Sequence, residues 1–137
     1  MVERFSRDAV REVEKYFLHN LRMVLMKNTL SMKLNRDFRR LYYKGGSSGS
    51  DILVVYYKKT SLPYSRLGIT VGKKVGGAVV RNRVKRLIRE SYRLIESEIE
   101  FRYDIVIVAR SKCAEADFKA VSGSLKRLFK KSGILSN

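Results

Sequence analysis

The pattern of apolar and polar positions is most regular after residue 77, where it repeats with the period of an α-helix. From Ala78 onward, successive side chains step around a helix by about 100°. A stripe about a third of the circumference wide then collects mainly apolar residues, namely Val80, Val84, Leu87, Ile88, Ser91, Leu94 and Ile95. A second arc, about 100° wide, collects Arg81, Asn82, Lys85, Arg89 and Tyr92. This pattern predicts a helix with one face in the core and a basic face beside it.

Three other stretches have helical periodicity. Residues 1–30 are predicted to form an amphipathic N-terminal helix, which packs on the domain or on another copy of the chain. The alternative is a mobile or wrongly assigned extension, with Met26 or Met32 as the true start. A short helix over residues 36–43 is predicted to be capped by Asn35 and ended by Gly45-Gly46. Asp117 is predicted to cap a last helix, with a buried stripe of Phe118, Val121, Leu125, Leu128 and Phe129.

Three stretches have the composition of strands: residues 52–58, 66–71 and 103–110. In the first, alternation puts Tyr56 and Tyr57 on opposite faces of the sheet. The third is an almost unbroken apolar run, which indicates a central strand buried on both faces. The second strand, the basic helix and the third strand form a β-α-β unit with parallel strands, and most such crossovers are right-handed. Residues 45–50 are predicted to be a Gly/Ser connection.

Charge narrows the class of partner. The 137 residues contain 30 Lys and Arg against 13 Asp and Glu, a net charge of +17, so an anionic partner is expected. Nucleic acid is favoured over a membrane surface, because no segment has the continuous apolar run that spanning requires. The single cysteine, Cys113, excludes an internal disulfide and is typical of a cytoplasmic protein. The length predicts one domain, and no signal peptide is visible.

The basic arc is suited to a phosphodiester backbone. Residues 73–93 contain eight Lys and Arg and one Glu. Cations supply charge and forked donors, and an amide can both donate and accept. The alternative is a solvated basic face, which usually carries interleaved Glu. The glycines around Lys73 and Lys74 lack the spacing of a nucleotide-binding loop, so only a flexible, anion-accepting helix entry is predicted.

Two clusters have less specific signals. Phe38 and Tyr42 stand at i and i+4 and share a helix face, which by itself indicates a core position. Glu96, Glu98 and Glu100 could suggest a magnesium site, but at this spacing they do not share one helical face. Solvated residues at the end of the helix are the preferred interpretation.

The sequence offers little for autonomous catalysis. It contains one histidine, His19, which excludes paired-histidine cleavage of RNA and leaves Cys113 without a local activating base. No paired carboxylates accompany the basic arc, as two-metal hydrolysis would need. The chain is therefore equipped to bind RNA rather than to cut it.

Residues 66–86, with the Arg81-Asn82-Arg83 core, resemble the signature of the bacterial ribonuclease P protein component, and the resemblance extends over roughly residues 31–131. It implies an α+β single domain over residues 31–137 and leaves the N-terminal helix predicted for residues 1–30 unexplained. The implied core is α-β-β-α-β-α, with a left-handed β-α-β crossover as in the ribosomal S5 domain 2-like fold. We therefore expect a left-handed crossover here, although most β-α-β crossovers are right-handed.

The resemblance also implies a function: a protein subunit of ribonuclease P that assists removal of the 5′ leader from precursor tRNA. Its partners would be the catalytic RNA subunit and precursor tRNA, with no membrane and no obligate protein partner. Mg²⁺ would be held mainly by the RNA subunit and the substrate. No catalytic or metal-ligating residue is expected in the protein. A ribosomal or general single-stranded RNA-binding protein, or a ribonuclease acting alone, are the alternatives.

The resemblance assigns roles to particular residues. The leader-binding cleft is expected to comprise Phe38, Tyr42, Tyr56, Lys73 and Lys74. The basic helix is expected to face RNA through Arg81, Asn82, Lys85 and Arg89, with further subunit contacts from Arg83 and Arg86. The sequence departs from the family pattern at Gly72 and Gly77, where longer polar side chains are frequent.

Overall fold

The computed structural model describes residues 28–136 of the chain. The strands are β1 (Thr29–Ser31), β2 (Gly46–Gly49), β3 (Leu53–Lys59), β4 (Ser65–Val71) and β5 (Tyr103–Ala109). The helices are α2 (Asn35–Lys44), α3 (Ala78–Ile95) and α4 (Phe118–Lys131), with the 3-10 helices η3 (Glu96–Glu98) and η4 (Ser111–Glu115). The helix predicted for residues 1–30 lies outside the described residues, except for its last three positions. Of these, Thr29 and Leu30 belong to β1 rather than to a helix.

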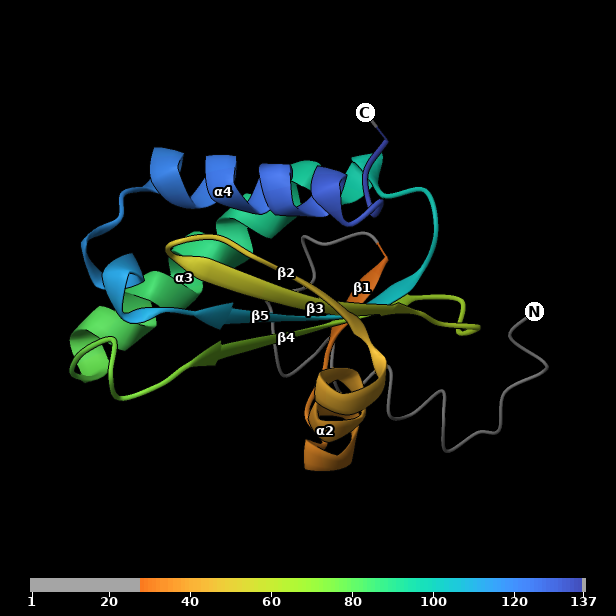
Figure 1. The fold of residues 1–137 in the computed structure, drawn as a ribbon, viewed down its shortest axis with the longest axis horizontal. Coiled ribbons are helices and arrows are strands. Elements are labelled where there is room, and N and C mark those ends of the chain that lie inside the picture. The colour runs from red at the N-terminus through yellow and green to blue at the C-terminus, as the bar shows by residue number, and fades with distance from the viewer. Residues whose placement is uncertain (1–27, 137) are drawn as a thin grey trace.

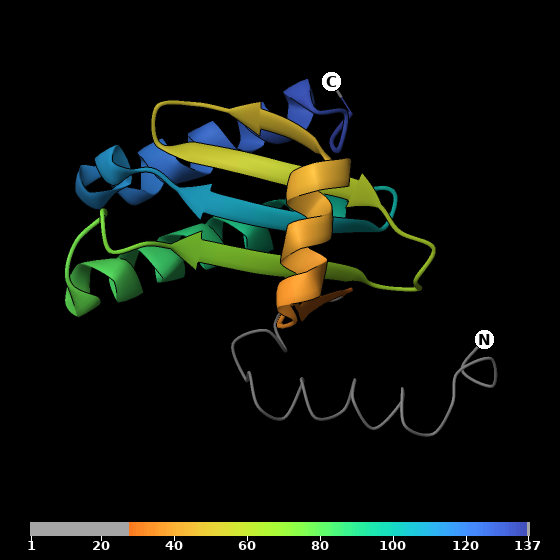
Figure 2. The same ribbon diagram turned by 60° about the horizontal axis from the view of Figure 1, so that its bottom comes forward.

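The strands form one sheet in the order β1-β4-β5-β3-β2. The apolar strand β5 lies in the centre and is parallel to β4, as the sequence predicted, and it also pairs antiparallel with β3. Figure 2 shows α2 in front of the sheet, α3 behind it, and β5 above β4 with both arrows pointing the same way. The β4–α3–β5 connection is therefore left-handed, and the fold is the predicted single α+β domain.

The sheet separates two apolar clusters of unequal size. α3 and α4 cover one face, and α2 crosses the other (Figure 1). Leu53 and Val55 of β3 are fully buried in the larger cluster beneath α3 and α4, and Tyr57 packs against that cluster. Tyr56 points to the opposite face, where it joins the smaller cluster beneath α2. The predicted alternation of β3 is thus confirmed.

Two local predictions on the α2 side were wrong. Leu34, not Asn35, is the N-cap of α2, and no side chain caps that helix. The Gly/Ser connection contains a strand, β2, which pairs with β3 from Gly46↔Tyr57 to Gly49↔Val54. A Cβ atom at Gly46 would lie 2.6 Å from Cζ of Tyr57, so glycine allows the edge strand to pair over that ring.

The buried face of α3 differs from the prediction at both flanks. Tyr92, predicted on the basic arc, is fully buried, and its hydroxyl lies 2.8 Å from Oγ1 of Thr29 in β1. Burial raises the pKa of this phenol above its usual value. Glu96, predicted to be solvated, is also buried and accepts hydrogen bonds from Thr29 Oγ1 and the Asn28 amide. β1 supplies these partners, so the core reaches further around α3 than the apolar pattern indicates.

On the outer side, two predicted core residues are exposed. Leu94 of α3 is 54% exposed and Phe118 of α4 is 40% exposed. The remaining predicted stripe of α4 is buried, and Asp117 caps that helix by accepting a hydrogen bond from the Ala120 amide at 2.8 Å. None of the helices within residues 28–136 is long and apolar enough to cross a membrane.

Candidate nucleic-acid interface

An aromatic groove lies between α2 and the sheet. Its volume is about 330 Å³ and its lining residues are Asn35, Phe38, Arg39, Tyr42 and Thr70. The ring of Tyr42 packs edge-on against that of Tyr56, with centroids 4.8 Å apart and an interplanar angle of 77°. Helical spacing puts Phe38 and Tyr42 on one face of α2, and strand alternation brings Tyr56 up from β3. The three predicted cleft aromatics therefore meet, each with part of its surface exposed.

Gly68 of β4 explains how Phe38 lies so close to the sheet. A Cβ atom at position 68 would stand 2.6 Å from Cε1 and Cζ of the Phe38 ring. Only a residue without a side chain leaves room for that ring. Gly68 therefore lies directly beneath Phe38, which lines the groove, although the motif in which it occurs gave no sign of this role.

The groove continues along the sheet into a second hollow of about 610 Å³, and Thr70 lines both. The second hollow lies over the ends of β4 and β5, and its cations are Lys74, Arg110 and Lys112. Lys73 is exposed beside Lys74 in the turn after β4. An aromatic groove thus leads to a basic end. Sequence reasoning missed Thr70, Arg110 and Lys112. The pairing of β4 with β5 places Thr70 here, whereas Arg110 and Lys112 follow the end of β5 and have no local signal.

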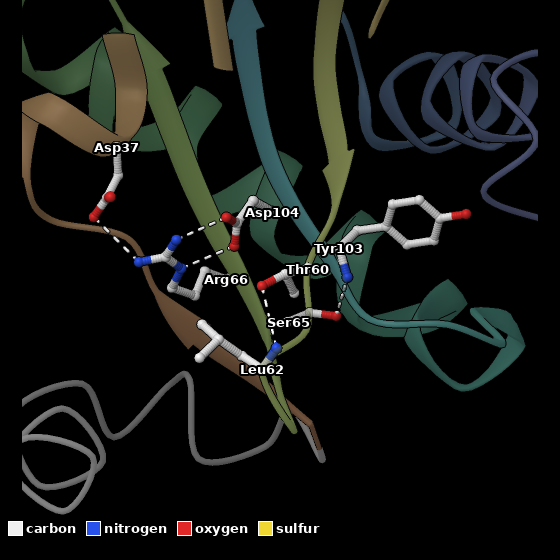
Figure 3. A network of polar contacts seen from close by, with 7 residues as sticks. All are labelled: Asp37, Thr60, Leu62, Ser65, Arg66, Tyr103 and Asp104. Carbon is white, nitrogen blue, oxygen red and sulfur yellow. Dashed lines mark hydrogen bonds and ion pairs between the residues drawn. The ribbon is translucent and has the colours of Figure 1, made fainter. Parts of the chain in front are cut away.

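Arg66 of β4 ties α2 to the sheet (Figure 3). Its Nε and Nη2 donate to the two carboxylate oxygens of Asp104 in β5, at 2.8 and 2.7 Å. Its Nη1 donates to Asp37 of α2 at 3.1 Å. The hydrogen bonds from Arg66 to Asp104 raise the pKa of the guanidinium. Since Asp37 directly precedes Phe38, this network holds the aromatic face of α2 in place over the strands.

α3 presents a different, basic surface on the other side of the sheet. Asn82 and Arg86 are exposed, and Arg81, Lys85 and Arg89 are half-buried. A shallow hollow of about 690 Å³ is formed by side chains of this helix alone: Val79, Asn82, Arg83, Lys85, Arg86 and Arg89. The predicted residues of the basic helix therefore share one surface, apart from Arg81, which is not among those that line this hollow.

Arg83 has a structural contact that the sequence did not predict. Its Nη2 donates to the carbonyl oxygen of Ala116, just before α4, at 3.0 Å. The guanidinium therefore joins the start of α3 to the start of α4. Its role as an RNA contact stays a prediction.

The described part of the chain has no evident site for metal-assisted chemistry. Among residues 28–136, no group of three or more His, Cys, Asp or Glu side chains could hold a metal ion. Cys113 is buried, and burial raises the pKa of its thiol, which keeps it in the less reactive protonated form. The arrangement can bind anions and unpaired bases, whereas groups for bond cleavage are not found in this part.

A small, strongly basic α+β domain with an aromatic groove on one face and a cation-bearing helix on the other is an RNA-binding protein. Comparison with known proteins identifies the family. The model of the family Ribonuclease P matches residues 26–133. The chain belongs to the ribonuclease P protein family, so it is a subunit of the endoribonuclease that processes tRNA 5′ ends.

Individual relatives support this assignment over nearly their whole length. The ribonuclease P protein component of Alkaliphilus metalliredigens is 44% identical over 111 residues, which cover 81% of this chain and 100% of that protein. That of Clostridium novyi is 46% identical, with coverage of 80% and 98%. The solved RNase P protein of Staphylococcus aureus is 36% identical with a TM-score of 0.72, covering 77% of this chain and 97% of that one. A Staphylococcus aureus mutant described as defective in mRNA degradation activity is 32% identical, with a TM-score of 0.74 and coverage of 87% and 98%.

Proposed function

We propose that this protein holds the single-stranded 5′ leader of precursor tRNA in the groove between α2 and the sheet, and binds the catalytic RNA subunit through α3. The observation that carries the proposal is that Phe38 and Tyr42 line one groove and that the ring of Tyr56 packs against Tyr42. Bases stack on aromatic side chains for about 1–3 kcal/mol each, whatever their sequence. A groove of this kind suits leaders that differ from one tRNA to the next.

In this proposal the leader runs along the groove toward its basic end. Unpaired bases would stack near Phe38 and Tyr42, and the phosphates would then pass Thr70 toward Lys73 and Lys74. Arg110 and Lys112 add two further cations at that end. Phosphate contacts by lysine are point-charge contacts that fix position without reading sequence.

Gly72 and Gly77 leave this end open. A Cβ atom at either position would meet no atom within 4 Å, so neither glycine is required by packing. Gly77 is also the N-cap of α3, where backbone N–H groups point outward and the helix dipole favours an anion. The departures from the family pattern therefore expose backbone, which supports a phosphate contact at the entry of α3.

Catalysis would then belong to the RNA subunit. In this proposal the RNA and the substrate hold the Mg²⁺ ions, and water attacks the phosphodiester to leave a 5′-phosphate on mature tRNA. The protein contributes by fixing the leader and by adding positive charge near the RNA. We place this assembly in the cytoplasm, where tRNA is processed.

A series of leader lengths tests the proposal. Holoenzyme assembled from this protein and its cognate RNA subunit should bind precursor tRNA more tightly as the leader is lengthened, until the groove is filled. Beyond that length the dissociation constant should stay constant. An affinity that does not depend on the leader would refute leader binding. Equal affinity of the free protein for unrelated RNAs would instead favour a general RNA-binding protein.

A further inference from the structure

The outer side of α4 is a second cationic surface, which neither the aromatic groove nor α3 includes. Five exposed Lys and Arg side chains project from this helix: Lys119, Lys126, Arg127, Lys130 and Lys131. The helix contains no Asp or Glu between Phe118 and Lys131. A helix that is merely solvated usually mixes charges of both signs, because like charges at i and i+4 repel.

These cations have no acidic partner in the described part of the chain. The ion pairs found there join Arg66 to Asp37 and Asp104, and Arg93 to Glu90. On the neighbouring helix α3, Glu90 therefore neutralises Arg93, whereas no acidic side chain within residues 28–136 neutralises the cations of α4. A concentration of unpaired charge on one helix indicates an anionic partner.

Gly123 lies within this surface, where a Cβ atom would stand 3.4 Å from Nη1 of Arg127. It lies one or two turns from Lys119, Lys126, Arg127 and Lys130, on the same side of the helix. A glycine inside a helix costs about 1 kcal/mol relative to alanine. At this position it leaves a space on the helix surface that the Arg127 guanidinium partly fills.

The position of α4 indicates which RNA it meets. α3 and α4 lie side by side on one face of the sheet, and α2 with the aromatic groove lies on the other (Figure 1). The hydrogen bond from Arg83 to the Ala116 carbonyl joins the starts of the two helices. The exposed sides of α3 and α4 therefore belong to the same side of the sheet, whereas a leader in the groove is separated from α4 by the sheet.

We infer that α4 is a second docking surface for the phosphodiester backbone of the catalytic RNA subunit, continuous with that of α3. Lys119, Lys126 and Lys130 form its centre, and Arg127 and Lys131 form its outer edge. This inference rests on the proposed function, because it extends the same RNA contact from one helix to two. It assigns no base recognition to α4, since unpaired lysines neutralise phosphates without reading sequence.

The test is the salt dependence of binding between the protein and its cognate RNA subunit. Each phosphate contact contributes about 0.7–0.9 to the slope of log K against log salt concentration. The double variant Lys126→Gln/Lys130→Gln should therefore lower the slope by about 1.4–1.8 and weaken binding on the order of tenfold at low salt. The matched control is Lys44→Gln/Lys58→Gln, which removes two exposed charges from the α2 side. Circular dichroism and urea unfolding check that both variants fold.

The outcomes separate this inference from the proposed function. A lower slope for the α4 variant, an unchanged slope for the control and an unchanged preference for leader-bearing tRNA would support the inference. An unchanged slope for the α4 variant, or an equal fall for the control, would overturn it. A fall in tRNA binding alone would also overturn it, because the partner would then be the substrate. Failure of the wild-type protein to bind the RNA subunit would instead overturn the proposed function.

Discussion

Replacing Phe38 by alanine should reduce the preference of the holoenzyme for leader-bearing over mature tRNA by about 5- to 150-fold. This range corresponds to the loss of one base stack, about 1–3 kcal/mol. Phe38 lies against the sheet above Gly68 and lines the groove, so its removal takes away a stacking face of the groove. The measurement is the ratio of dissociation constants for the two tRNAs.

Tyr43 provides the matched control on the same helix. It is 86% exposed and does not line the groove. Tyr43→Ala should leave the ratio unchanged, because it removes an aromatic ring from α2 without touching the proposed leader path. If Phe38→Ala weakens the two tRNAs equally, or if Tyr43→Ala has the same effect, the assignment of the groove to the leader is incorrect.

Replacing Arg66 by alanine should lower the free energy of unfolding by about 2–4 kcal/mol. Loss of one partner from a buried charge network leaves the others uncompensated, which typically costs 3–5 kcal/mol. We expect a smaller loss of about 2–4 kcal/mol because the side chains of Arg66, Asp37 and Asp104 are still 21%, 9% and 14% exposed to solvent. Urea unfolding measures the change. Since the network anchors α2, the preference for leader-bearing tRNA should fall as well.

The ion pair on α3 gives the comparison for that prediction. Arg93 and Glu90 are 2.9 Å apart, but their side chains are 37% and 41% exposed. Arg93→Ala should therefore change the free energy of unfolding by less than about 1 kcal/mol. Arg66→Lys should recover only part of the loss, because an ammonium cannot reproduce the forked contact with Asp104. Equal losses for Arg66→Ala and Arg93→Ala would contradict the anchoring role.

The parts of the fold that the sequence predicted are those with strong local patterns. The unbroken apolar run of β5 indicated its central place, and alternation put Tyr56 and Tyr57 on opposite faces. β2 was missed because Gly and Ser have low strand propensity, so its structure depends on pairing with β3. The left-handed crossover could not come from general rules, which favour the opposite hand.

The features of the candidate site that follow from local patterns were also predicted, and those that depend on long-range contacts were not. Helical spacing predicted that Phe38 and Tyr42 share a face, and the basic arc of α3 was visible in the charge pattern. Tyr92 was misplaced because β1, only three residues long, supplies its partner Thr29. The packing of Phe38 over Gly68 and the Arg66 network depend on tertiary contacts and strand register, which join residues far apart in the sequence. Such long-range pairings are not contained in local periodicity.

The central claim is that this protein serves a catalytic site made of RNA, and a reconstitution assay tests it most directly. Purified protein, cognate RNA subunit or both are incubated with 5′-labelled precursor tRNA in limiting Mg²⁺, and with an unrelated mRNA in parallel. The mRNA arm is included because a Staphylococcus aureus RNase P protein mutant is described as having defective mRNA degradation activity. We expect leader release only when both components are present, and an intact mRNA with protein alone. Cleavage of either RNA by the protein alone, with an activity that stays proportional to the protein concentration at each purification step, would contradict this claim.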